Sequence, residues 1–181
     1  MAWGAQIETG SVATSYIPTT TASVTRNADV ITKTGVSGFI GQTEGTLYAE
    51  LDVRNFQVNG RILAISDGSS NNRVALLSNT LSRISLRVSE SGVAQASIDS
   101  STLSSGVYKV AVAYAANDFV LYVNGAQIGT DTSGTVPACS EVFLGKAEAS
   151  ASAAQLNDRI RAAAIYTSRL SNAELASLTT L

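Results

Sequence analysis

The stretch from Val107 to Gly129 reads VYKVAVAYAANDFVLYVNGAQIG and indicates the fold class. In its first part, valines and tyrosines alternate with other residues at the period of two that a pleated strand requires. Turn-forming residues at Ala116–Asp118 precede a dense apolar run at Phe119–Val123. Asn124-Gly125 then supplies the two positive-φ positions of a type I′ hairpin turn, and Ala126–Ile128 returns. The stretch predicts three consecutive antiparallel strands. Because it is apolar on both faces, we expect it in the middle of a packed sheet.

The composition limits the classes of protein that the chain can belong to. Its 181 residues are enough for one sizeable core, and they are 45% hydrophobic and 14% charged, with a formal net charge of −2. A nucleic-acid partner is not expected, because nucleic-acid binding needs a basic face. A membrane partner is not expected either, because no apolar run reaches about 18 residues.

The chain contains a single cysteine, Cys139, and no histidine. One cysteine excludes an internal disulfide, and we expect it to be a small buried hydrophobe rather than a reactive thiol. The absence of histidine removes Ser-His-Asp and Cys-His catalysis and the usual zinc sites. Any catalysis would therefore depend on carboxylates.

Further short runs follow one another at the intervals typical of a β-sandwich. In Leu47–Arg54 the odd-numbered residues are apolar and the even-numbered ones are mostly polar, so the two sets face opposite sides of a sheet. Ser171-Asn172-Ala173-Glu174 is a capping box that begins a short C-terminal helix over Leu175–Leu178. A small-residue loop, Ala147–Ala154, suggests no chemistry. The other predicted strands are Trp3–Ile7, Arg61–Ser66, Arg73–Leu77, Leu81–Val88, Val93–Ile98, Glu141–Leu144 and Arg159–Tyr166.

The first 30 residues differ from the rest of the chain. They are rich in Ser and Thr, and Pro18 holds the preceding residue extended. Trp3, Tyr16 and Ile17 are too apolar to remain in water, so we expect them to dock on this sheet or on a partner chain. The sequence therefore predicts an extended arm or linker with a docking role at residues 1–30 and a β domain at residues 31–181.

Three segments carry a resemblance to a known family: GVYKVAVAYAANDFVLYVNGAQIGTDTSG, EVFLGK and LNDRIRAAAIYTSRLSNAELASL. They resemble the second half of concanavalin A-like (laminin G-like) domains, of the kind found in structural proteins of tailed bacteriophages and prophages. The segment WGAQIETGSVATSYIPTTTASVTRNADV is similar to a linker upstream of such domains in phage tail and fibre proteins. The resemblance implies an all-β fold: a two-sheet antiparallel jelly-roll sandwich of the lectin/glucanase type, with an extended N-terminal arm and one short C-terminal helix.

Glycosidases share this fold, and the strand around Glu50 carries part of their catalytic motif. Retaining jelly-roll glucanases carry Glu-x-Asp-x-(x)-Glu on one strand, which places nucleophile and acid about 5–5.5 Å apart. Here Glu50 and Asp52 share a face, but Arg54 and Asn55 stand where the second Glu would be. A solvated polar strand face is the favoured interpretation, and we expect no catalytic residues. A jelly-roll glycosidase remains the remote alternative.

Two sets of polar residues are candidates for binding. The loop from Asp67 to Asn72 offers oxygen ligands for Ca²⁺ at Asp67, Asn71 and Asn72, although a plain polar turn needs the same residue types. The second set could form one exposed sheet face that holds a glycan, or a solvated face with charge pairs such as Asp52 with Arg83. This second set comprises Tyr48, Glu50, Asp52, Arg54, Arg83 and Arg87.

These observations lead to one leading hypothesis and one alternative. The leading hypothesis is a non-enzymatic phage virion protein, a jelly-roll module on the particle surface in a capsid decoration or tail fibre. Its partners would be other virion proteins, with a homo-oligomer such as a trimer. No cofactor is expected beyond the Ca²⁺ considered above. The alternative is a glycan-binding module that recognises a polysaccharide of a host bacterial surface.

The docking role of the N-terminal arm leads to a first prediction. Deletion of residues 1–25 should leave a folded domain but abolish assembly into particles, because the apolar arm would make the contacts with neighbouring subunits. Circular dichroism and particle incorporation measure the two effects. Normal incorporation of the truncated protein would contradict the docking role.

Overall fold

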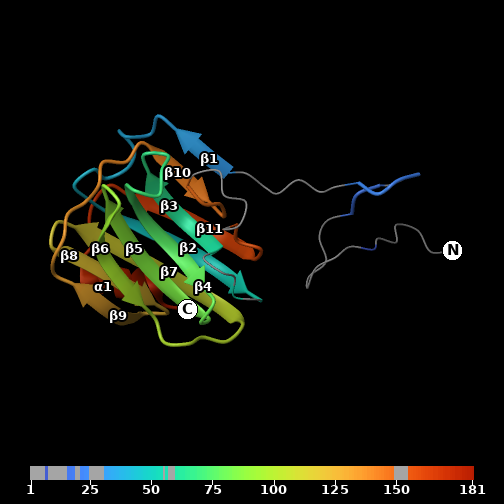
Figure 1. Cartoon of the computed structure of the whole chain (residues 1–181). Helices are drawn as coiled ribbons and strands as arrows, with labels where there is room; N and C mark the ends of the chain where they lie inside the picture. The colour runs from blue at the N-terminus through green and yellow to red at the C-terminus, as the bar shows by residue number, and fades with distance from the viewer. Residues whose placement is uncertain are drawn as a thin grey trace.

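A computed structural model of the chain shows a two-layer β-sandwich with one short helix (Figure 1). No helix in the described part of the chain has the length and apolar character needed to cross a membrane. The residues that the structure describes are 7, 16–18, 21–24, 31–54, 56, 60–148 and 155–181.

Two antiparallel sheets form the two layers. In spatial order, the six-stranded sheet contains β1 (Ile31–Thr34), β10 (Glu141–Leu144), β3 (Gly60–Ser66), β4 (Arg73–Asn79), β5 (Arg83–Glu90) and β6 (Val93–Asp99). The five-stranded sheet contains β11 (Arg159–Tyr166), β2 (Glu44–Val53), β7 (Gly106–Ala115), β8 (Asp118–Val123) and β9 (Ala126–Asp131). The predicted all-β sandwich with antiparallel sheets is therefore confirmed.

The core lies between the sheets and follows the alternation read from the sequence. On β2, the residues at 47, 49, 51 and 53 point inward, and on β5 Ile84, Leu86 and Val88 do the same. Leu47, Ile84 and Leu86 are completely buried. Residues at alternate positions thus meet across the sandwich, and the polar residues between them face outward on each sheet.

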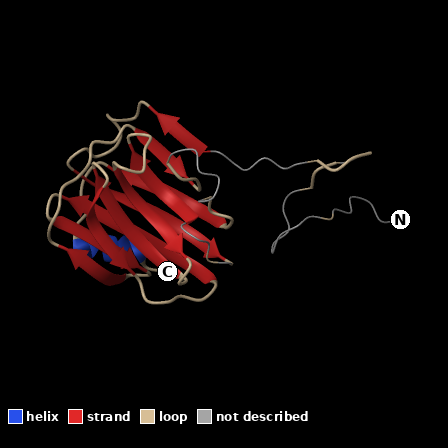
Figure 2. Ribbon diagram, in the orientation of Figure 1, coloured by secondary structure: helices blue, strands red, loops and turns tan. Residues whose placement is uncertain are grey.

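Helix α1 (Asn172–Thr179) packs on the outer face of the five-stranded sheet, over β7 and β8 (Figure 2). Its capping box forms as predicted, with Ser171 accepting from the backbone N–H of Glu174 and the Glu174 carboxylate accepting from that of Ser171. Leu175 packs against outward-facing residues of β7 and β8, including Val120 and Tyr122. The central strands are therefore buried on both faces, by the second sheet on one side and by the helix on the other.

The strands of the Val107–Gly129 stretch are confirmed as β7, β8 and β9. Asn124 and Gly125 adopt φ values of 49° and 80°, as the type I′ turn requires. The expected position in the middle of a sheet is correct for β7 and β8 but wrong for β9, which lies at the sheet edge. The side chains of β9 are mostly half-buried or exposed, in keeping with that edge position.

Strand β1 was not predicted from the sequence. All four of its residues are exposed, and its sequence ITKT therefore lacks the alternation of apolar and polar residues that reveals a half-buried strand. It pairs with β10 at the edge of the six-stranded sheet, with Ile31 opposite Leu144 and Thr34 opposite Glu141.

A buried tyrosine connects β7 to the chain segment that leads into β2. Tyr114 is completely buried, and its hydroxyl donates to the Gly41 carbonyl oxygen at 3.0 Å. A Cβ added at Gly45 would lie 2.3 Å from the Tyr114 Oη, so only glycine fits opposite this ring. The hydroxyl thus gives this carbonyl a hydrogen-bond donor inside the protein.

Replacing Tyr114 by Phe should lower the free energy of unfolding by about 1–2 kcal/mol, because it leaves the Gly41 carbonyl without its donor. The matched control is Tyr108→Phe, which removes an exposed hydroxyl bond to Ser104 O and should cost less than about 0.5 kcal/mol. Denaturant titration of both variants measures the difference. An equal loss of unfolding free energy in both variants would show that the buried hydrogen bond stabilises the protein no more than the exposed one.

Candidate functional site

The six predicted glycan-binding residues do not share one face. Tyr48, Glu50, Asp52 and Arg54 belong to β2 and its end, in the five-stranded sheet, whereas Arg83 and Arg87 lie on β5 in the six-stranded sheet. Both groups point away from the core, so they occupy opposite outer surfaces of the sandwich. The expectation of a single face is wrong, and so is the expected pairing of Asp52 with Arg83.

On the five-stranded sheet, Tyr48 is not an open platform for a sugar ring. It is only 9% exposed and belongs to the cluster under helix α1, with Ala111, Tyr122 and Leu175. Burial raises the pKa of the Tyr48 hydroxyl, and the nearby Glu50 and Tyr166 add to that effect. Tyr48 therefore contributes to packing under the helix.

The acidic residues of β2 are held in ion pairs on the solvent side. Glu50 Oε1 lies 3.5 Å from Arg161 Nη1, and Asp52 Oδ2 lies 3.8 Å from Arg159 and 3.9 Å from Arg54. Glu50 and Asp52 share a face, as the sequence predicted, and arginines rather than a second glutamate surround them. This arrangement is a partly exposed charge network in which each pair has a small energetic value.

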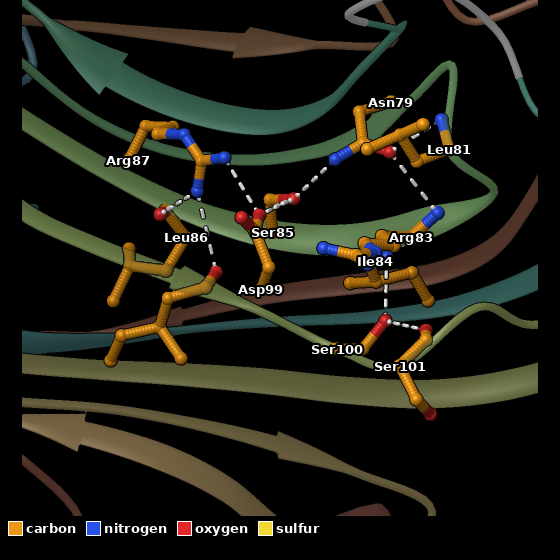
Figure 3. Close-up of polar contacts among 11 residues, drawn as sticks. Asn79, Leu81, Arg83, Ile84, Ser85, Leu86, Arg87, Asp99, Ser100 and Ser101 are labelled. Atoms are coloured by element: carbon orange, nitrogen blue, oxygen red, sulfur yellow. Dashed lines mark hydrogen bonds and ion pairs between the residues drawn. The ribbon is translucent and has the colours of Figure 1, made fainter.

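The outer face of β4, β5 and β6 carries a connected row of polar side chains, which we call the polar row: Asn79, Ser85, Arg87 and Asp99 (Figure 3). Asn79 Nδ2 donates to Ser85 Oγ at 3.2 Å, and Ser85 Oγ donates to Asp99 Oδ1 at 2.5 Å. Arg87 Nη2 donates to the same Asp99 oxygen at 2.6 Å. The arginine is also held by the Leu86 carbonyl at 2.9 Å, so the row is preorganised from one strand to the next.

Asp99 is the centre of the polar row. Partial burial raises its pKa, but hydrogen bonds from Ser85 and Arg87 and the charges of Arg87 and Arg83 outweigh that effect, so the pKa lies below its ordinary value. The carboxylate is therefore ionised at neutral pH. Only Oδ1 is bonded within the described residues, which leaves Oδ2 as an acceptor, and the side chains of Asp99 and Arg87 are 32% and 28% exposed.

A buried ion triad, which we call the Glu148 clasp, lies on the same sheet. Glu148 Oε2 accepts from Arg61 Nε and Oε1 from Arg73 Nη1, both at 2.7 Å, and the Glu148 side chain is fully buried. Arg61 and Arg73 are on the neighbouring strands β3 and β4, whereas Glu148 lies in the connection between β10 and β11. The clasp fastens this connection to the outer side of the six-stranded sheet.

The predicted calcium residues take part in the hydrogen bonds of their own loop. Asp67 Oδ1 accepts from the Ser69 N–H at 2.9 Å, and Oδ2 accepts from Asn72 Nδ2 at 2.7 Å. Asn72 Oδ1 in turn accepts from the Ser91 N–H at 2.7 Å. These bonds are those of a polar turn. Asn71 accepts from Gly92 N through its backbone carbonyl. No group of three potential acidic, Cys or His ligands occurs in the part of the chain that the structure covers, and the calcium role stays a prediction.

The remaining predictions concern the arm and the cysteine. Tyr16 is 48% exposed and Ile17 is half-buried, whereas Trp3 lies outside the described residues, so the docking role stays a prediction. The interpretation of Cys139 as a buried hydrophobe is confirmed: it is free and buried, and burial raises the pKa of its thiol to about 12, with a smaller contribution from the charge of Asp67.

Sequence reasoning missed Asn79, Ser85 and Asp99 of the polar row, and all three members of the Glu148 clasp. The outward position of Ser85 between Arg83 and Arg87 was a usable signal, because it shares their face. Asp99 was missed because the predicted strand ended at Ile98, although the alternation of buried Ala96 and Ile98 with exposed Ser97 continues to it. Glu148 lies in the small-residue loop to which no chemistry was assigned.

With this geometry established, comparison with known proteins identifies the class as a lectin-like jelly roll. The family model described as the concanavalin A-like lectin/glucanases superfamily (Laminin_G_3) matches residues 14–176, so the chain belongs to this family. The match begins inside the segment assigned to the arm, and the division at residue 30 stays a prediction. Among curated proteins, no sequence matches the chain significantly.

Several solved structures share the fold. The CBM40 of the Ruminococcus gnavus IT-sialidase, bound to α2,3 sialyllactose, has a TM-score of 0.67 at 15% identity, over 85% of this chain and 97% of that one. The NanB sialidase of Streptococcus pneumoniae has a TM-score of 0.66 at 11% identity, over 83% of this chain and 26% of that one. A SAP-like pentraxin from Limulus polyphemus has a TM-score of 0.54 at 14% identity, over 75% and 69%. At these identities the likeness concerns the fold.

The Glu148 clasp makes a testable contribution to stability. Glu148→Gln should lower the free energy of unfolding by about 3 kcal/mol at pH 7, because two largely buried arginines lose their carboxylate. Glu50→Gln, which weakens an exposed pair, is the control and should cost less than about 1 kcal/mol. Denaturant titration of both variants against the parent chain provides the comparison.

The same variant has a defined pH dependence. Burial raises the pKa of Glu148, but the hydrogen bond and charge of Arg61 and the charge of Arg73 outweigh it and hold the pKa below its ordinary value of 4.5. The contribution of Glu148 is therefore present above pH 4.5 and disappears as the pH falls through the folded-state pKa. The stability gap between the parent chain and Glu148→Gln should narrow on acidification. A gap independent of pH would show that the charge is not responsible.

Proposed function

We propose that this protein is a non-enzymatic glycan-binding module, and that its binding surface is the outer face of β4, β5 and β6. The observation that carries the proposal is the polar row, in which Asp99 Oδ1 accepts hydrogen bonds from Ser85 and Arg87 and Oδ2 is left for a ligand. A sugar hydroxyl both donates and accepts hydrogen bonds. It can therefore donate to Asp99 Oδ2 while it accepts from the Arg87 guanidinium.

The preorganisation of these side chains favours binding. Arg87 is held by the Leu86 carbonyl and by Asp99, so a ligand that bonds to it immobilises little further side-chain freedom. The strands β4, β5 and β6 carry no aromatic residue, so recognition on this face would depend on hydrogen bonds rather than on ring stacking. The fold neighbours support a glycan as the ligand class, since one of them is a carbohydrate-binding module bound to sialyllactose.

The absence of enzymatic activity is part of the proposal, because some fold neighbours are whole sialidases. It is supported by the surroundings of Glu50 and Asp52, which are ion-paired with arginines and have no second glutamate on their strand. A role in a phage virion, its partner proteins, a surface position on the particle and a homo-oligomer remain proposals that rest on the resemblance alone. Glycan binding and a role in the virion do not exclude each other, because a virion protein on the particle surface can bind glycans.

The test is a glycan array probed with a multimerised form of the full chain, followed by calorimetry on the best glycan. Arg87→Ala should weaken binding at least tenfold, because it removes a donor and releases Asp99. Ser97→Trp should do the same by obstruction, since Ser97 is exposed and lies opposite Arg87 in the β5–β6 pairing. Arg161→Ala, on the opposite outer face, is the control and should bind as the parent chain does.

Two results would overturn the proposal. The first is an array on which no glycan binds the multimerised chain above background. The second is a bound glycan whose affinity falls with Arg161→Ala but not with Arg87→Ala or Ser97→Trp, which would place the site on the five-stranded sheet. Thermal melting of each variant shows whether it remains folded.

A further inference from the structure

Arg83 differs from the other arginines in the described part of the chain. Each of those others pairs with a carboxylate: Arg54 and Arg159 with Asp52, Arg61 and Arg73 with Glu148, Arg87 with Asp99, Arg161 with Glu50, and Arg169 with Asp118. Among the described residues, Arg83 has no ion pair and its guanidinium donates no hydrogen bond. The contact of Arg83 with the Asn79 side chain comes from its backbone N–H, which donates to Asn79 Oδ1 at 3.3 Å.

The isolation of this guanidinium is not explained by full exposure to water. Arg83 is half-buried, and its Nε is a buried donor without a partner. Arg73 and Arg169 also have an unpartnered buried Nε, but their terminal nitrogens are compensated by Glu148 and Asp118. The charge of Asp99 is near enough to act on Arg83, but it forms no ion pair with it and accepts no hydrogen bond from it. A partly buried guanidinium without a hydrogen-bond acceptor calls for an explanation, and a ligand that supplies one would provide it.

Arg83 lies beside the polar row. It is on β5, two residues before Ser85 on the same outward face, and opposite Asn79 on β4 (Figure 3). Its charge lowers the pKa of Asp99 together with that of Arg87, so two guanidinium groups act on one carboxylate. The surface around Asp99 therefore carries an excess positive charge, although the whole chain has a net charge of −2.

We infer that Arg83 selects glycans that carry an anionic group, a carboxylate or a sulfate, and that this group pairs with the Arg83 guanidinium while sugar hydroxyls contact Arg87 and Asp99. The inference rests on the proposed function, because it names the ligand class of the same surface. Guanidinium groups pair well with such anions through parallel N–H···O bonds. A neutral sugar would leave Arg83 uncompensated and bind less tightly.

The experiment compares three probes that share a lactose core: lactose itself, 3′-sialyllactose and 3′-sulfolactose. Calorimetry with the full chain should show at least tenfold tighter binding of one or both anionic probes than of lactose. The preference should shrink when the salt concentration rises, because the added contact is between charges. The carboxylated and sulfated probes show which anion is preferred.

Variants assign the preference to Arg83. Arg83→Gln should reduce the affinity for the anionic probe to near that for lactose and leave lactose binding almost unchanged, whereas Arg83→Lys should retain part of the preference. Because the hydrogen bond from Arg83 to Asn79 Oδ1 comes from the backbone N–H, both variants keep it. Arg161→Gln, which removes an exposed arginine from the opposite outer face, is the matched control and should keep the full preference.

The possible failures are distinguishable. If lactose and both anionic probes bind equally, the inference is wrong and the proposed function stands. If Arg83→Gln weakens all probes equally, Arg83 maintains the surface rather than selecting a charge, and the inference is again wrong. If none of the probes binds and the glycan array is also blank, the proposed function itself fails.

Discussion

Strands β7 and β8 are buried on both faces, and this double burial determines how the rest of the molecule is arranged. Their inward residues, such as Val112 and Leu121, contact the core, while Ala113 and Val120 on the other side lie in the cluster with Leu175 of α1. A sheet that is apolar on both faces needs a cover on each. Here the six-stranded sheet supplies one cover and the C-terminal helix supplies the other. The helix also limits where a ligand could bind, because it covers the outer face of the five-stranded sheet over β7 and β8.

The features that depend on a local sequence pattern were predicted correctly. The hairpin turn at Asn124-Gly125 and the capping box at Ser171 depend on residues adjacent in the chain, and both form as expected. The inward and outward sets of β2 and β5 also follow from their period of two. Alternation, however, states only whether a residue faces the core. It does not state which sheet the strand joins, and for this reason residues of β2 and β5 were wrongly combined into one face.

The residues of the candidate site were harder to predict because β-bulges change the direction of side chains. In the β5–β6 pairing, Glu90 is opposite Val93, and uninterrupted counting would put Asp99 opposite the inward residue Ile84. The bulge near Ser89 shifts the register by one, so that Asp99 lies opposite Ser85 and faces outward. A second bulge, between Arg61 and Leu63, accompanies the Arg61 contact with Glu148. That contact joins residues 87 positions apart, a separation over which no periodic pattern operates.

The bulge in β6 also has a consequence for how such a surface can diversify. A strand has two sets of side chains, and the extra residue determines which set faces solvent beyond that point. Loss or gain of one residue there would exchange the two sets over the rest of the strand, whereas substitutions must change them one at a time. In a fold whose members differ widely in sequence, short insertions and deletions at strand edges are thus a direct route to new surface chemistry, provided that the exchanged residues are small enough for the core. At this point of β6, such an exchange would turn exposed Ser97 toward the core and the buried Ala96 and Ile98 toward solvent.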